Sequence, residues 1–115
     1  MLEPKIFDNA DYESRLACNH ELMALVASEF IKEAEGLLVE LSLHIQHQDW
    51  VNFALVAHRL KGAALEVSGY RFCQLISKME RHALQSDHQS LGEDHRHLKS
   101  EFIVLVKALK LDILS

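Results

Sequence analysis

The chain has 115 residues with 12 basic and 17 acidic side chains, and its formal net charge at neutral pH is −5. This length fits a single domain over residues 1–115, and the negative charge speaks against nucleic acid as the main partner. Apolar residues make up 49% of the chain, while four glycines and one proline, Pro4, give too little turn chemistry for many short strands. We therefore expect an all-helical globular domain.

The first half of the chain predicts a short helix followed by a long one. Asp8 or Asn9 can cap the short helix, which we expect to end near Cys18. Asn19 can cap the long helix. Apolar residues recur in that helix every three or four positions, at Leu22, Val26, Phe30, Ala34, Leu37, Leu41 and Ile45.

Three more helices are predicted after short polar connections. Asp49 can cap a helix that ends before Ser68 and Gly69. A fourth helix carries Phe72 to Ala83, and a fifth carries Leu91 to Leu109 after a polar segment. Connections this short make neighbouring helices antiparallel. The expected fold is an antiparallel four-helix bundle with a short additional N-terminal helix.

The helix that follows Asp49 carries a histidine opposite its apolar side. At about 100° per residue, His58 points away from the arc that contains Phe53 and Leu60. The residues around His58 on this outer face are largely apolar: Val51, Ala54, Leu55, Lys61, Gly62 and Leu65. Two explanations remain open, because the short N-terminal helix can cover this face or the face can be a docking site.

Gly62 and Lys61 lie one turn from His58. A glycine inside a helix costs about 1 kcal/mol relative to alanine, and its missing side chain leaves the histidine ring open to an approaching group. Lys61 can bring a positive charge to the same point, which suits an anion. A chance exposed histidine beside a tolerated glycine explains the same residues.

The segment from Ala57 to Ala64, Ala-His-Arg-Leu-Lys-Gly-Ala-Ala, resembles the signature of the histidine phosphotransfer (HPt) domain. The likeness extends to Asn19, Glu21, Leu22 and Phe30, to Asp49 and Trp50, and to Met79 and Glu80. Two positions differ from the family pattern. Leu65 stands where the family has a small residue, and Gly69 comes one residue later than the family's helix-ending glycine.

The resemblance implies a phosphorelay function, in which His58 accepts a phosphoryl group from one receiver domain's aspartate and passes it to another. In that role Lys61 stabilises charge on the phosphoryl oxygens. Glu80 accepts a hydrogen bond from the second ring nitrogen of His58, or is a plain solvent-facing charge. The expected docking residues for the receiver are Val51, Ala54, Leu55, Arg59, Gly62 and Leu65.

The resemblance also implies partners and a setting. The partners are receiver domains of response regulators or hybrid kinases, and the chain itself is a free-standing module or the C-terminal piece of a hybrid sensor kinase. We expect no cofactor in this chain, because the receiver brings magnesium. We expect a monomer, with no contact to nucleic acid or membrane.

Other functions find less support in the sequence. The chain has no Gly-rich phosphate loop and no acidic cluster for magnesium, and Arg59 stands where kinase dimerisation domains have an acidic residue. We expect no autonomous kinase activity. Seven histidines besides His58 lie outside metal-binding motifs, so no metal site is expected. The rival interpretation is a non-catalytic adaptor bundle that binds a partner through the apolar face.

Two further observations bear on the compartment. No apolar run approaches the ~18 residues of a membrane-spanning helix, and the first ten residues lack the basic and apolar regions of a secretory signal. Two cysteines, Cys18 and Cys73, allow at most one disulfide, which suggests a reducing compartment. We expect a cytoplasmic protein or the cytoplasmic part of a membrane-bound kinase.

Overall fold

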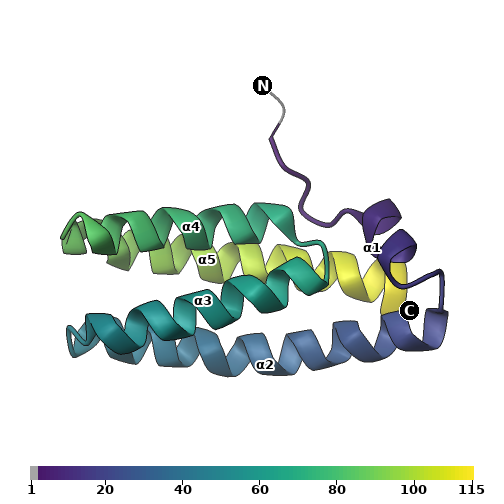
Figure 1. Cartoon of the computed structure of the whole chain (residues 1–115), viewed down its shortest axis with the longest axis horizontal. Coiled ribbons are helices and arrows are strands. Elements are labelled where there is room, and N and C mark those ends of the chain that lie inside the picture. The colour runs from purple at the N-terminus through teal and green to yellow at the C-terminus, as the bar shows by residue number, and fades with distance from the viewer. Residues whose placement is uncertain (1–2) are drawn as a thin grey trace.

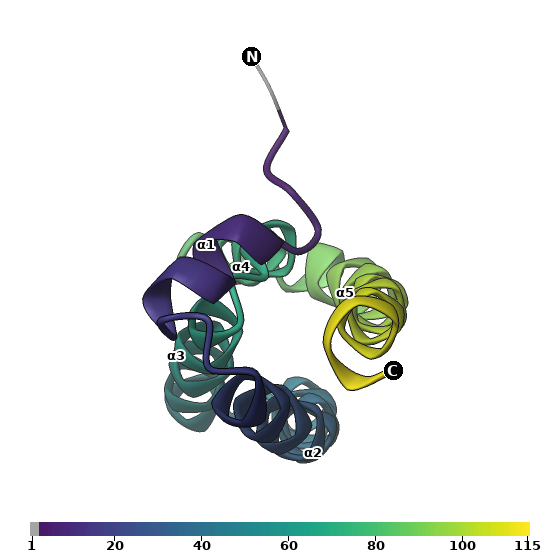
Figure 2. The ribbon, with the colours of Figure 1, turned by 90° about the vertical axis from the view of Figure 1, so that its right-hand side faces the viewer.

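Four long helices pack antiparallel around one core in the computed structural model, which describes residues 3–115 (Figure 1). A short helix, α1, crosses one end of the bundle. Viewed along the bundle, the long helices follow one another around the core in chain order (Figure 2). The bounds are α1 Asn9–Arg15, α2 His20–Gln46, α3 Trp50–Glu66, α4 Tyr70–Leu84 and α5 His88–Leu109. The predicted fold class is confirmed.

The helix starts follow local capping chemistry. The side chains of Asp8, Asn19 and Asp49 each accept a hydrogen bond from a backbone N–H three residues on, in the first turns of α1, α2 and α3. The end of α1 was predicted less well. It lies at Arg15, short of the region near Cys18, because Ala17 and Cys18 have positive φ angles of 52° and 55° and so cannot continue a right-handed helix.

The inner face of α3 is the one that the helical spacing predicts. Its buried residues are Phe53, Val56, Ala57, Leu60, Ala63 and Ala64, and Val67 follows them just beyond the helix. Deeper in the bundle, Phe30, Phe72 and Phe102 form a cluster of three aromatic rings from α2, α4 and α5, with centroids 5.9–6.4 Å apart. These contacts fix the rotation of each helix about its own axis.

The C-terminal end departs from the predicted pattern. After Leu109 the chain continues as one π-helical turn, η1 (Lys110–Leu114), instead of ending with α5. Ile113 and Leu114 pack against the core, and the turn bends toward α2 (Figure 2). It therefore closes one end of the seam between α2 and α5. No helix within residues 3–115 has the length and hydropathy needed to cross a membrane.

A carboxylate fastens α1 to the turn between α3 and α4. The Oδ2 atom of Asp11 accepts hydrogen bonds from the hydroxyls of Tyr70 and Ser68, at 2.5 and 2.7 Å, and from Nε of Arg15 at 3.2 Å. These donors, with the Tyr70 hydroxyl contributing most, hold the pKa of Asp11 below its ordinary value. The ionised carboxylate is therefore the form that anchors α1.

This anchor makes the stability of the fold depend on pH. Because the pKa of Asp11 is lowered by folding, its contribution is present above the ordinary value near 3.8 and is lost as pH falls through the lower folded value. We predict that the protein loses more free energy of unfolding between about pH 6 and about pH 3 than the Asp11→Asn variant does. Denaturant titrations at both pH values measure this. The exposed Asp112→Asn variant is the control, and equal losses in Asp11→Asn and wild type would refute the role of Asp11.

Candidate functional site

His58 lies in the middle of α3 with its side chain in solvent. The residues one turn away on the same face, Ala54, Leu55 and Gly62, are also exposed. A Cβ added at Gly62 would have no neighbour within 4 Å among the residues that the structure describes. No packing contact there requires glycine, and Gly62 leaves the surface one turn from His58 without a side chain.

An ion pair joins α3 to α4 beside His58. Nζ of Lys61 donates to Oε1 of Glu80 at 2.7 Å, and both side chains are partly buried. This charge-assisted hydrogen bond fixes where the Lys61 ammonium lies. The sequence predicted that Glu80 bonds the His58 ring or faces solvent alone, and neither is found: in residues 3–115 no hydrogen bond joins Glu80 to His58. Glu80 positions Lys61 instead.

A second cation lies on the other side of His58, toward α2. Nη2 of Arg59 is 3.6 Å from Oε1 of Glu33, and both side chains are well exposed. An exposed pair of this kind contributes little to stability. The two pairs leave His58 between a firmly held Lys61 and a loosely held Arg59, and a carboxylate balances each cation.

The apolar surface around His58 is open. Val51 is 75% exposed, Leu55 61% and Leu65 45%. Together with Ala54, Arg59 and Gly62, which are also exposed, they form what we call the His58 face. The predicted docking residues thus lie together on one surface. An exposed apolar surface of this kind is typical of interaction sites.

The position of α1 tests the first of the two explanations given for this face. Nη2 of Arg15 donates to the carbonyl oxygens of Leu65 and Glu66, at 2.8 and 3.0 Å, and so caps the last turn of α3. α1 therefore sits over the end of α3 (Figure 1) and leaves Val51 and Leu55 uncovered. The interpretation in which the N-terminal helix covers the outer face of α3 is wrong.

The cysteine near the site is inert. The thiol of Cys73 lies in α4 and donates to the carbonyl oxygen of Lys61 at 3.7 Å. Burial raises the pKa of Cys73 to about 11, so the thiol stays protonated at neutral pH and is a poor nucleophile. Cys18 is exposed and both cysteines are free thiols. Cys73 is therefore a small buried residue of the core.

The other histidines form pairwise contacts that helical spacing could not reveal. Nδ1 of His82 contacts Oδ2 of Asp94 at 2.5 Å, linking α4 to α5. His95 contacts Leu38 across α2 and α5. Within residues 3–115, no group of three or more His, Cys, Asp or Glu side chains is arranged to hold a metal ion.

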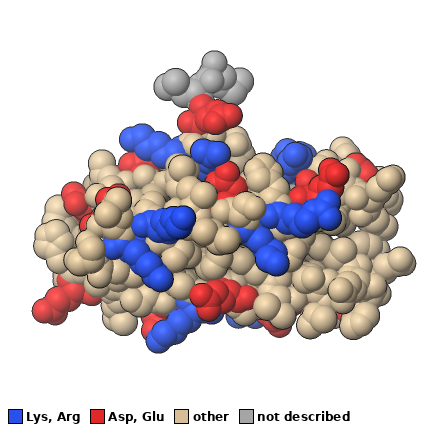
Figure 3. Space-filling model, turned by 180° about the vertical axis from the view of Figure 1, so that it is seen from behind, with Lys and Arg blue, Asp and Glu red and all other residues tan. Residues whose placement is uncertain are grey.

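Surface charge on the side of α5 does not single out another site. Figure 3 views the molecule from the side on which α5 lies, and basic and acidic side chains occur across this face with uncharged surface between them. Comparison with known protein families, curated proteins and solved structures found no match. The function of this chain is therefore inferred from the geometry around His58.

The exposure of the His58 face makes a prediction about stability. Leu55→Glu and Leu65→Glu should each change the free energy of unfolding by no more than about 0.5 kcal/mol, because the new carboxylate stays in water. Leu60→Glu on the inner face of α3 is the matched control and should unfold the domain, since it buries an unpaired charge. Denaturant unfolding of the three variants measures this. If Leu55→Glu is as destabilising as Leu60→Glu, the face is covered.

Proposed function

We propose that this chain is a histidine phosphotransfer module, in which His58 carries a phosphoryl group between the aspartates of partner receiver domains. The observation that carries the proposal is an exposed histidine on an open apolar face, with Lys61 and the bare backbone of Gly62 one turn away. These residues stand in the segment from Ala57 to Ala64 that resembles the HPt signature. The combination supports group transfer more specifically than a general docking role.

In this function His58 acts as a nucleophile. The unprotonated nitrogen of its imidazole attacks the phosphorus of an aspartyl phosphate. The N–P bond forms as the P–O bond to the aspartyl carboxylate breaks, and the carboxylate leaves as an anion. The second ring nitrogen keeps its proton. Transfer to the next receiver reverses these steps with a new carboxylate as the acceptor.

Lys61 supplies the electrostatic part of the reaction. Phosphoryl transfer passes through a loose transition state, in which positioning and charge stabilisation provide most of the rate enhancement. The Lys61 ammonium has three N–H donors, so it can keep its bond to Glu80 and donate another to a phosphoryl oxygen. In this proposal Glu80 is a positioning residue. It holds the side chain of Lys61 and does not contact the ring of His58.

The His58 face serves as the docking surface in this proposal. A receiver that covers Val51, Leu55 and Leu65 excludes water from the phosphoryl group and brings its own aspartate and magnesium toward His58. The large side chain of Leu65, which is 45% exposed, projects from this face and would help to select receivers that accommodate it. The low cysteine content fits a cytoplasmic module.

A second candidate function rests on the apolar face alone. An adaptor that binds a partner helix or surface would also expose Val51 and Leu55. It would have no use for the nucleophile or for the positioned Lys61. The two functions differ in one product, because only phosphotransfer leaves phosphohistidine on the chain.

We predict that His58→Gln abolishes phosphoryl acceptance and leaves the fold intact, because the His58 side chain is exposed and packs little. The chain is incubated with phosphorylated receiver domains, and an acid-labile, alkali-stable adduct is located by intact-mass and peptide mass spectrometry. His20→Gln, an exposed histidine at the start of α2, is the control and should be phosphorylated normally. An adduct on the His58→Gln variant would exclude His58 as the acceptor, and no adduct with any receiver would favour the adaptor.

We predict that Lys61→Ala slows transfer by about 10- to 100-fold without abolishing it, because a charge-assisted contact of about 1.5–3 kcal/mol is lost while the nucleophile remains. Single-turnover rates with a phosphorylated receiver measure the change. Arg59→Ala is the matched control, since this neighbouring cation belongs to an exposed pair and its removal should change the rate by less than about threefold. A rate unchanged in Lys61→Ala would remove Lys61 from the mechanism.

A further inference from the structure

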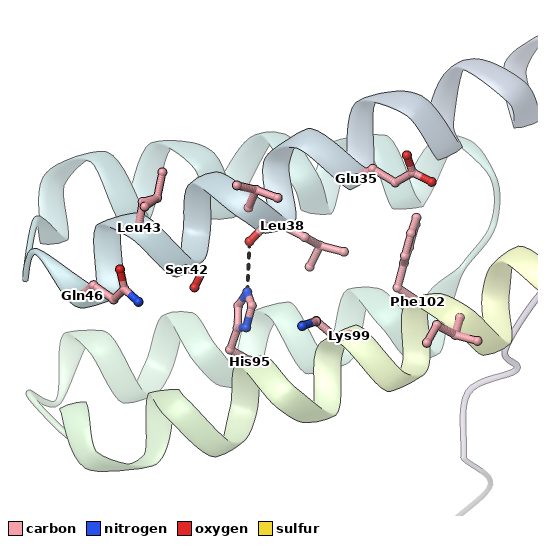
Figure 4. Close-up of a pocket in the computed structure, with 10 residues that line it drawn as sticks. Glu35, Leu38, Ser42, Leu43, Gln46, His95, Lys99 and Phe102 are labelled. Carbon is pink, nitrogen blue, oxygen red and sulfur yellow. Dashed lines mark hydrogen bonds between the residues drawn. The ribbon is translucent and has the colours of Figure 1, made fainter.

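A groove of about 470 Å³ lies between α2 and α5, away from the His58 face (Figure 4). Its apolar floor is formed by Leu38, Val39 and Leu43 of α2 and by Phe102 and Ile103 of α5. Val39, Leu43 and Ile103 are exposed, so the floor of the groove is in contact with water. The seam between α2 and α5 thus leaves unburied apolar surface, which points to a missing partner.

One hydrogen bond fixes the register of the two helices. Nε2 of His95 donates to the carbonyl oxygen of Leu38 at 3.0 Å, which sets residue 95 level with residue 38 (Figure 4). Because α2 and α5 are antiparallel and rise equally per residue, residue 35 is then level with residue 98. Glu35 and Lys99, which both line the groove, therefore lie at nearly the same level on opposite walls.

Glu35 and Lys99 are exposed to solvent. None of the ion pairs within residues 3–115 includes either side chain. The groove thus presents an apolar floor between an acidic group on one wall and a basic group on the other. A surface of this kind is complementary to its own copy, because a two-fold rotation about an axis along the groove exchanges the walls and keeps the level.

We propose that this groove is the interface of a homodimer, in which α2 of each copy packs over α5 of the other. Glu35 then faces Lys99 of the partner subunit, and the same pair forms a second time across the axis. Val39, Leu43 and Ile103 are covered by the helices of the other copy, which exclude water from them. The apolar contacts supply the affinity, and the two ion pairs select this arrangement over others.

The dimer and the phosphotransfer function do not depend on one another. The long helices follow in the order α2, α3, α4, α5 around the core, so an interface on the α2–α5 side leaves the outer face of α3 free (Figure 2). His58 stays accessible in both copies. The proposed dimer differs from the monomer expected from the sequence, and its test requires no receiver domain.

Sedimentation equilibrium of the full chain over a range of concentrations tests the interface. The wild-type chain should show a reversible monomer–dimer equilibrium. Ile103→Glu should raise the dimer dissociation constant by at least about tenfold, because it places a carboxylate in the apolar contact on both sides of the dimer. Leu84→Glu, at an exposed leucine that ends α4, is the control and should dimerise like wild type. Circular dichroism and thermal melting verify that both variants fold.

Charge reversal tests the arrangement itself. Glu35→Lys and Lys99→Glu should each weaken the homodimer by at least about tenfold, because each creates two like-charge contacts. An equimolar mixture of the two variants should restore the dimer, since both contacts become attractive in the heterodimer. A monomeric wild type at all concentrations would overturn the proposal and leave the groove to a different ligand. A dimer that is insensitive to the reversals, or a mixture that stays monomeric, would overturn it as well.

Discussion

The rotation of α3 about its own axis is the constraint on which the candidate site depends. Phe53, Leu60 and Ala64 are buried against the other long helices, and each residue of an α-helix is turned by about 100° from the one before it. Burial of one stripe therefore fixes the direction of every other side chain on α3. His58 faces solvent because core packing leaves it no alternative, and a rotation large enough to bury it would expose the core.

The Lys61–Glu80 pair adds a second layer of control over this site. A bare lysine on a helix surface samples many rotamers, and ordering it costs side-chain entropy. The bond to Glu80 orders the Lys61 ammonium before any ligand binds. The Glu80 carboxylate also neutralises part of the charge of Lys61. The resting site is consequently organised for an anion without being strongly basic.

Local chemistry accounts for what the sequence predicts well. Caps such as Asp8 and Asp49 act over three residues, and the apolar spacing of α3 reads directly as an inner and an outer face. The end of α1 was missed because Ala17 and Cys18 adopt left-handed backbone conformations, and neither alanine nor cysteine favours that conformation. The π-helical turn η1 was missed for a similar reason, since its packing depends on the tertiary position of α2.

Contacts between distant residues account for what the sequence could not predict. Whether the His58 face is covered depends on where α1 lies, and Asp11 fixes α1 through Ser68 and Tyr70, which are 57 and 59 residues away. The partner of Glu80 and the register of the groove are likewise set by pairs on different helices, Lys61 with Glu80 and Leu38 with His95. Helical periodicity within one segment carries no information about such pairs.

At position 62, the residue that would stabilise the helix differs from the residue that suits the candidate site. A methyl group there would meet no neighbour within 4 Å in residues 3–115, while alanine is favoured over glycine inside a helix by about 1 kcal/mol. Selection for thermal stability alone would therefore replace Gly62, which lies one turn from His58 on the same exposed face of α3. Stabilised versions of this domain should be chosen by surface accessibility of the imidazole as well as by melting temperature.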